Sequence, residues 1–315
     1  MSYSLRNCRG MEDCKHIADI YGRCRVTDGL ESVWTLEEVE NSFQHLTNCD
    51  PEKDMVIVEK EGEPVAYSMM WWFDCEEGRM YPLLINVVPE ARDQGITERL
   101  VEWAKDHVSE MGHDNDKKTI QIVLEPGEGY ISEASEKMGF TYYRYGLTML
   151  RPNLEDIPEY PLPDGVEVRP VKPEEHESIR LAWNEACKDL RAQQPLSKEN
   201  LEGWRKEPDF DDSLWTIAWY GDEVVGTCFG MISTKDNQVY ERKRGMTELI
   251  SSRKDWRGKG LAKALISMTL QKLKDRGMEE AALGVDPDNP SGARHLYEKL
   301  GFQEVSRVSF YRYRV

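Results

Sequence analysis

The sequence lacks the spacing patterns that mark most cysteine-based sites. It has seven cysteines, an odd number, and no two of them form a CxxC pair. Cys8, Cys14 and Cys24 lie near one another in the chain, but no His or Cys stands at zinc-finger spacing from them. We therefore expect free thiols in a reducing compartment and no metal site.

Long apolar runs and an excess of positive charge are also missing. The opening residues, MSYSLRNCRGMEDC, contain no apolar segment of a secretory signal, and no later stretch approaches a membrane span. The net charge of −17 argues against broad nucleic-acid binding, which neutralises phosphates with Lys and Arg. These absences predict a cytoplasmic protein with no nucleic-acid partner and no membrane partner.

The chain is long enough, at 315 residues, for two domains that each bury a core. Its charge is uneven. Residues 1–150 carry 15 basic and 29 acidic residues, a balance of −14, which leaves 26 basic and 29 acidic residues, a balance of −3, for the remainder. A polyanionic ligand is therefore expected in the second half.

The two halves of the sequence repeat each other. The segment 151–165, RPNLEDIPEYPLPDG, carries four prolines and predicts a linker between domains at 1–150 and 166–315. Across it, Arg6 matches Arg169 and the corner SEKMGF matches YEKLGF, at an offset of about 162 to 165 residues. Two copies of one domain are the expected organisation.

Each copy has the expected order β-α-α-β-β-β-α-β-α-β-β. Each copy has a glycine-containing loop, ARDQGITERL at 91–100 in the first and WRGKGLAKAL at 256–265 in the second. The strand before this loop and the strand after the following helix form a β-α-β unit, which makes these two strands parallel. The predicted fold is therefore α/β, with a mixed and mostly antiparallel sheet around one central parallel pair in each copy.

The glycine loop of the second copy, WRGKGLAKAL at 256–265, stands where a strand ends and a helix begins. A helix amino terminus attracts phosphate through its unpaired N–H groups, and Gly258 and Gly260 leave the backbone open to an anion. Arg257, Lys259 and Lys263 add positive charge. The loop lacks the GK[ST] of a P-loop and the third glycine of a dinucleotide fingerprint. By itself it is equally compatible with a glycine turn that carries solvated charges.

Two motifs together resemble the GNAT acetyltransferase superfamily. Arg257-Gly-Lys-Gly260-Leu-Ala262 resembles its acyl-CoA pyrophosphate loop, [QR]-x-x-G-x-[GA]. The segment from Asn289 to Phe302 resembles its second signature, N-x-x-x-A-x-x-L-Y-x-x-x-G-F. The likeness covers nearly all of 166–315 and extends more weakly over 3–150, so the chain resembles a tandem GNAT protein of the mycothiol-synthase-like type.

The resemblance implies a site for acetyl-CoA as cosubstrate. The loop amides would hold the pyrophosphate, and the pantetheine arm would lie between the two parallel strands, which splay apart in this family. Tyr297 would be the general acid that protonates the leaving thiolate. The residues expected to contact the cofactor are Leu249, Ile250, Ser251, Ser252, Arg257, Gly258, Lys259, Gly260, Leu261, Ala262, Asn289, Ala293 and Tyr297.

Direct attack of an amine on a thioester also needs a base for the ammonium proton. Glu248 is the candidate, because period two places it on a strand face with Ile250 and Ser252. Glu248 can equally well be a strand glutamate that faces solvent, and Tyr297 can also be an aromatic residue of the core. His295 is a weaker candidate, since it lies two residues before Tyr297 and points elsewhere on a helix.

The first copy has different residues at the matching positions. Asp93 replaces Gly258, Gln94 replaces Lys259 and Glu98 replaces Lys263. Each exposed negative charge near the loop weakens the binding of a pyrophosphate by roughly a kcal/mol. Ser135 replaces the tyrosine and Leu83 the glutamate. We expect a pseudo-catalytic first domain, although the loop keeps its arginine and one glycine, which leaves weak CoA binding open.

The sequence favours a CoA-dependent N-acyltransferase, with acetyl-CoA as donor, a small-molecule primary amine as acceptor and catalysis in 166–315. Two alternatives remain. One is a non-catalytic acyl-CoA-binding or regulatory module, and the other is an interaction scaffold built on the acidic first domain. The acceptor, the acyl specificity and the oligomeric state are not encoded in these motifs.

Overall fold

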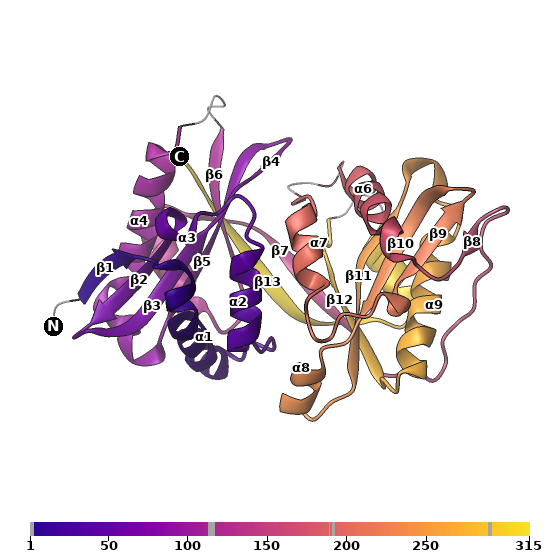
Figure 1. Cartoon of the computed structure of the whole chain (residues 1–315), viewed down its shortest axis with the longest axis horizontal. Helices are drawn as coiled ribbons and strands as arrows, with labels where there is room; N and C mark the ends of the chain where they lie inside the picture. The colour runs from indigo at the N-terminus through magenta and orange to yellow at the C-terminus, as the bar shows by residue number, and fades with distance from the viewer. Residues whose placement is uncertain (1–2, 113–116, 189, 191–192, 289–291) are drawn as a thin grey trace. The chain divides into compact units, whose positions relative to one another are not determined.

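The computed structural model describes residues 3–112, 117–188, 190, 193–288 and 292–315 (Figure 1). The chain forms two compact units, one made of residues 1–145 with 307–315 and the other of residues 146–306. Each unit combines helices with a mixed β-sheet. The expected α/β class is confirmed.

The first unit follows the predicted order of elements with three differences: a short helix is added before its second strand, a short strand is added after its third, and one strand closes it instead of two (Figure 1). Its strands are β1 (Tyr3–Asn7), β2 (Met55–Lys60), β3 (Glu63–Met70), β4 (Phe73–Cys75), β5 (Gly78–Val87), β6 (Lys118–Leu124) and the start of β7 (Thr141–Arg151). Its helices are α1 (Cys14–Asp28), α2 (Leu36–Gln44), α3 (Pro51–Asp54), α4 (Ile96–Glu110) and α5 (Gly129–Lys137).

Local signals in the sequence explain where these helices begin and end. Thr35 and Glu38 form a capping box at the start of α2, and Asp50 caps α3 ahead of Pro51. Helix α1 ends at Gly29, which has a left-handed backbone with φ of 66°. The buried faces of α1 and α4 pack on β3 and β5, where Tyr67 belongs to a core that is closed to solvent.

The second unit repeats this order with two differences: its described residues have no counterpart of α3, and a helix stands where the first unit has β4. Its strands are β8 (Glu167–Val168), β9 (Thr216–Tyr220), β10 (Glu223–Met231), β11 (Arg244–Ser252), β12 (Glu280–Val285) and the start of β13 (Gln303–Arg314). Its helices are α6 (His176–Cys187), α7 (Lys198–Trp204), α8 (Thr234–Val239), α9 (Leu261–Asp275) and α10 (Ala293–Lys299). Its core contains Trp215 stacked on Phe229, with ring centroids 4.0 Å apart.

Each unit contains one parallel strand pair in an otherwise antiparallel sheet. In the first unit β5 runs parallel to β6, and in the second β11 runs parallel to β12. Pairing of β11 with β12 covers only Arg244–Met246 and ends well before β11 does. The two strands therefore separate toward their carboxyl ends, next to the glycine loop.

The closing strands are exchanged between the halves of the sequence. Residues Ser309–Arg314 of β13 pair with β6 inside the first unit, and Leu147–Arg151 of β7 pair with β12 inside the second unit. The predicted boundaries at 1–150 and 166–315 thus differ from the units of the structure. Each half also ends in one long strand, where the sequence predicted two.

The proline-rich segment 151–165 lies against the second unit. It has no regular helix or strand, but Leu154 is buried, and the Lys274 Nζ donates to the carbonyl oxygen of Glu155 at 3.1 Å. The Lys263 ammonium lies 5.6 Å from the centre of the Tyr160 ring. These contacts place the segment along helix α9. No helix within the described ranges combines the length and the apolar character that a membrane span requires.

Candidate active site

The glycine loop of the second unit leaves a stretch of backbone open. It follows β11 through a short 3₁₀ turn at Lys254–Trp256 and leads into α9. Gly258 and Gly260 have φ of 73° and 84°, in the left-handed region that favours glycine. A Cβ added to either would meet no described atom within 4 Å. The loop therefore lies open to a ligand on this side.

The amides of this loop are unpaired. Within the part of the chain that the structure describes, no group accepts a hydrogen bond from the N–H groups of residues 258–263. The side chain of Leu261 is buried, so this residue and Ala262 contribute only backbone. Unpaired amides at the start of a 15-residue helix form an anion-binding surface.

Arg257 holds the loop in place. Its Nε donates to the carbonyl oxygen of Ser252 at 3.2 Å, and its Nη2 donates to the carbonyl oxygen of Ala186 at 2.8 Å. Lys259 lies over the Trp256 ring, with 4.9 Å from Nζ to the ring centre. Arg257 therefore ties the loop to β11 and α6 as a positioning residue, while the lysine supplies exposed charge.

The gap between β11 and β12 presents an unpaired backbone amide. The Arg253 N–H donates to the carbonyl oxygen of Val225 at 2.9 Å, so the preceding N–H, that of Ser252, faces away from β10. Pairing of β11 with β12 ends at Met246, so neither neighbouring strand accepts a hydrogen bond from the Ser252 amide within the described residues. An extended chain that enters the gap can accept a hydrogen bond there.

A β-bulge in β11 lies beside this gap. Thr227 pairs with Ser251 and Phe229 pairs with Glu248. The interval between the two pairs is therefore two residues long on β10 and three residues long on β11. Leu249, inside the bulge, has a φ of 45°, which is rare for a residue with a side chain. The Thr227 hydroxyl donates to the carbonyl oxygen of Leu249 at 2.6 Å and lies 2.8 Å from Ser251 Oγ.

The bulge corrects one sequence prediction. Regular alternation placed Glu248 on the same strand face as Ile250 and Ser252. The extra residue shifts the alternation, so Glu248 shares a face with Ser251 instead. Thr227, which stabilises the bulge, was not identified from the sequence. A polar residue inside the buried run VVGTCFG was the available signal.

Glu248 is half-buried and has no hydrogen-bond or ionic partner among the described residues. Burial raises the pKa of its carboxyl to about 7. A carboxylate with a pKa near neutrality can take a proton from an ammonium group and release it again at physiological pH. These properties fit a general base.

Tyr297 lies on α10 and is only 6% exposed. Burial raises the pKa of its hydroxyl far above the ordinary value, and the charges of Cys228 and Glu248 add to this effect. The hydroxyl has no hydrogen-bond partner in the described part of the chain. It therefore stays protonated and free to donate. The electrostatic coupling also means that Tyr297 and Glu248 lie in the same region.

The other predicted positions fall in different places. Ala293 is buried in the first turn of α10, and Asn289 lies outside the described residues. His295 is exposed and bonds through Nδ1 to Glu298 at 3.0 Å, away from the gap.

Both cysteines of this unit, Cys187 and Cys228, are buried, and burial raises each thiol pKa to about 12, so neither is an activated nucleophile.

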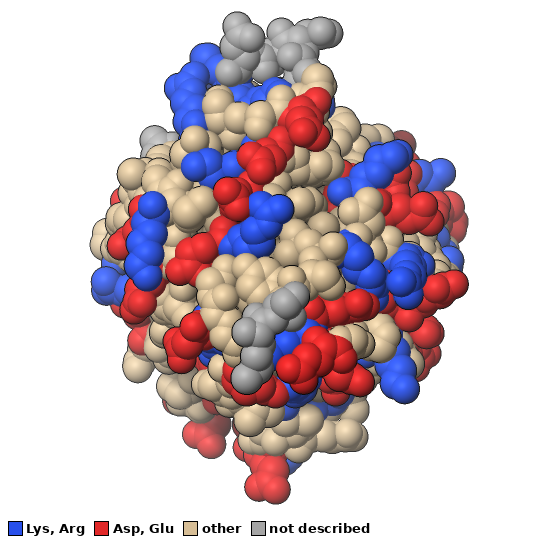
Figure 2. All heavy atoms as spheres, turned by 90° about the vertical axis from the view of Figure 1, so that its left-hand side faces the viewer, with Lys and Arg blue, Asp and Glu red and all other residues tan. Residues whose placement is uncertain are grey.

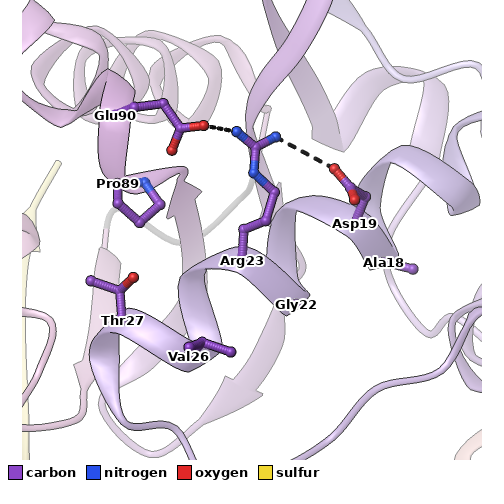
Figure 3. A pocket seen from close by; sticks show the side chains of 8 residues that line it. All are labelled: Ala18, Asp19, Gly22, Arg23, Val26, Thr27, Pro89 and Glu90. Carbon is purple, nitrogen blue, oxygen red and sulfur yellow. Dashed lines mark hydrogen bonds and ion pairs between the residues drawn. The ribbon is translucent and has the colours of Figure 1, made fainter.

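The first unit has a shallow hollow beside its own glycine loop (Figure 3). Ala18, Gly22 and Val26 of α1 line one side, and Glu90 lines the other. Arg23 forms an ion pair with Glu90 across the hollow and another with Asp19, four residues earlier on α1 (Figure 3). Two carboxylates thus share one guanidinium, and none of these residues matches a catalytic position of the second unit.

The acidic excess of the first half is not gathered into one patch on the face that Figure 2 shows. Acidic and basic side chains alternate over most of this face. Several carboxylates are engaged in ion pairs, such as Glu102 with Arg99 and Asp74 with Arg79. This arrangement gives no support to an acidic docking surface.

Fold and site together define a class of protein, in which tandem α/β domains place a splayed parallel strand pair next to a helix with open amides. The sequence model of the Acetyltransferase (GNAT) family matches residues 15–120 and 180–302. The chain belongs to this family, since the matched residues make up more than half of it.

Curated relatives are mycothiol acetyltransferases. The protein from Streptomyces scabiei is 31% identical over 198 residues, which is 62% of this chain and 62% of the relative. The protein from Catenulispora acidiphila is 27% identical over 256 residues, 79% of this chain and 77% of the relative. The matches to the Streptomyces scabiei and Streptomyces coelicolor proteins each span 62% of the relative. The chain therefore covers less than two thirds of their length.

Solved structures share the whole architecture. A GCN5-related N-acetyltransferase from Sphaerobacter thermophilus has a TM-score of 0.71 at 24% identity, and the match covers 99% of this chain and 95% of that protein's chain. A tandem GNAT protein from the clavulanic acid biosynthesis pathway has a TM-score of 0.69 at 14% identity, and the match covers 99% of this chain and 98% of that protein's chain. At these identities the likeness establishes the tandem fold.

Proposed function

We propose that the protein transfers an acyl group, in the first place acetyl, from CoA to the primary amine of a small molecule, with the chemistry in the second unit. The observation that carries the proposal is that Glu248, with a pKa of about 7, and Tyr297, which stays protonated, interact electrostatically within the second unit. Family membership supports acetyl-CoA as the cosubstrate.

In this proposal the acyl-CoA pyrophosphate binds the amides of residues 258–263, and its extended arm pairs with the Ser252 amide. The acceptor amine attacks the thioester carbonyl, and its ammonium proton passes to Glu248, directly or through water. The carbon–sulfur bond breaks as the tetrahedral intermediate collapses, and Tyr297 donates its proton to the departing thiolate. The inert cysteines of this unit favour such direct transfer over an acyl-cysteine intermediate.

The test measures CoA binding and turnover separately. Tyr297→Phe should bind CoA as tightly as the wild type, because it keeps the ring, while turnover falls by about 100-fold or more. Tyr142→Phe is the matched control, since Tyr142 is 52% exposed and lies in the first unit, and it should keep full turnover. Equal turnover of Tyr297→Phe and the wild type would remove Tyr297 from the mechanism.

The acceptor is tested with a panel of amines. Amino acids, aminoglycosides and mycothiol-type acceptors are offered with acetyl-CoA, and the mass of the acetylated product is measured together with release of the CoA thiol. The names of the relatives put mycothiol-type acceptors first. Tight CoA binding without turnover on any acceptor would favour the alternative, an acyl-CoA-binding module.

A cytoplasmic location is part of the proposal. All seven cysteines are free, including Cys49 and Cys75, which are only partly buried. Free, accessible thiols persist in a reducing compartment.

A further inference from the structure

The strand gap of the first unit is filled by a tyrosine of its own chain. The Val88 N–H donates to the carbonyl oxygen of Val65 at 3.0 Å, so the preceding N–H, that of Val87, faces away from β3 and into the gap between β5 and β6. The Val87 N–H donates to the hydroxyl oxygen of Tyr130 at 3.4 Å. Tyr130 therefore occupies the backbone position that an extended ligand would use.

Arg92 and Asp28 fix this tyrosine in place. The Arg92 guanidinium lies 3.9 Å from the centre of the Tyr130 ring and makes a two-pronged ion pair with Asp28, at 2.7 and 2.8 Å. Its Nε also donates to the carbonyl oxygen of Val87 at 2.9 Å. The arginine retained from the pyrophosphate motif is thus fully engaged by groups of the protein.

The segment before α5 is packed closely against the end of α1. A Cβ added to Gly127 would lie 1.9 Å from the carbonyl oxygen of Asp28, so the segment before α5 touches the end of α1 directly. Glu128, 8% exposed, accepts a hydrogen bond from the Glu125 N–H at 2.8 Å. Burial raises the pKa of the Glu128 carboxyl to about 7, and the nearby Asp28 charge adds to this rise, so a further anion is disfavoured here.

The second unit has the opposite arrangement at the same positions. The closing corners of the two copies are offset by 162 residues, since Gly139 matches Gly301. This offset places Gly292 opposite Tyr130. Gly292 has a φ of 70°, and a Cβ added to it would meet no described atom within 4 Å. The copy with the filled gap has a tyrosine here, and the copy with the open gap has no side chain.

We propose that the first unit binds no acyl-CoA because Tyr130 takes the place of the pantetheine arm, so that the chain binds one acyl-CoA, in the second unit. This inference rests on the proposed function. It assigns Tyr130, Arg92 and Asp28 a common role as a built-in replacement for the ligand, which keeps the gap of the first unit packed without a cofactor.

Calorimetric titration of the full chain with CoA measures the stoichiometry. One CoA per chain is expected, and two would overturn this inference while leaving the proposed function intact. No binding at all would contradict the proposed function itself.

Gly258→Asp with Lys259→Gln, which copies the first loop into the second, should reduce binding by at least 10-fold. A tight site that survives these changes would lie in the first unit and overturn the inference.

A reciprocal exchange tests the role of the tyrosine. Gly292→Tyr should lower CoA affinity by at least 10-fold, whereas Gly292→Ala, which has the same backbone strain at positive φ without the ring, should retain binding. A thermal melt checks that both variants fold. Tyr130→Phe keeps the ring and should leave one CoA per chain with unchanged turnover. Equal CoA affinity of the two Gly292 variants would overturn the assignment.

Discussion

At the scale of single residues, Glu248 connects burial with chemistry. A base must be deprotonated to accept a proton, and burial raises the pKa of this carboxyl to about 7. We expect kcat/KM to rise with pH through a limb near 7 and to level off above it. Glu248→Gln should lose this limb and at least about 100-fold in rate.

The acceptor amine also titrates, so the profile is measured with acceptors whose amines have different pKa values. A limb that stays near pH 7 for all of them belongs to the enzyme. A limb that follows the pKa of each acceptor would contradict the role of Glu248.

The same carboxyl links stability to pH. Its pKa is about 7 in the folded chain against an ordinary 4.5, so the folded state binds the proton more tightly than the unfolded state. Its stabilising contribution is full below pH 4.5 and is lost as pH rises through 7. Relative to the wild type, Glu248→Gln should therefore gain up to about 3 kcal/mol between pH 4.5 and pH 8. Urea unfolding of both proteins at the two pH values measures this gain, and a gain that does not change with pH would contradict it.

At the scale of elements, the bulge in β11 positions both the base and the open amide. The Thr227 hydroxyl donates to the carbonyl oxygen of Leu249, the residue with positive φ. Thr227→Val removes this donor at almost constant volume, so it should cost about 1–3 kcal/mol and lower kcat.

Ser68→Ala is the matched control for Thr227→Val. It breaks another hydrogen bond from a buried hydroxyl to a strand carbonyl oxygen, that of Leu84 at 2.9 Å, in the first unit. It should lose comparable stability in chemical unfolding and keep its activity. Equal loss of kcat in the two variants would show that the bulge has no special role.

The sequence predicts some elements well and others not at all. The parallel pair and the open loop follow from the spacing of Gly258, Gly260 and the flanking apolar runs, which are local properties. The bulge does not, because the φ of Leu249 depends on how β11 pairs with β10. Likewise the contact of Tyr130 with Val87 joins residues 43 positions apart, and no local pattern encodes it.

At the scale of the whole molecule, the exchanged strands determine which pieces can stand alone. The sequences TYYRYGLTML and VSRVSFYRYRV alternate in the same way, so period-two patterning could not decide which of them closes which sheet. In the structure, Tyr311 and Tyr313 of β13 pack on the core of the first unit, and Arg151 of β7 donates to a carbonyl oxygen of the second.

Deletion of residues 307–315 should therefore destabilise the first unit, although these residues are far from it in sequence. The change removes the six residues that pair with β6 and exposes part of the core. Limited proteolysis should cut first within residues 3–145. Deletion of Val315 alone is the control and should leave the digestion pattern unchanged. Equal protection of both proteins would contradict the exchange.

Two fragments make the complementary comparison. The fragment 141–306 contains every strand of the second unit, whereas 166–315 lacks β7, the partner of β12. We expect the first fragment to fold and bind CoA better than the second, as measured by circular dichroism and calorimetric titration. The opposite order would favour the boundaries predicted from the sequence.

The exchange also bears on the order of events during synthesis. Domains usually fold as they emerge, the N-terminal one first, at about 5–20 residues per second. Here the segment that completes the first unit begins at Arg307, while its main body ends at Tyr145. The ribosome needs roughly 10 to 30 seconds to cover that interval. During this time β6 has an unpaired edge, and the half that is made first is the last to be completed.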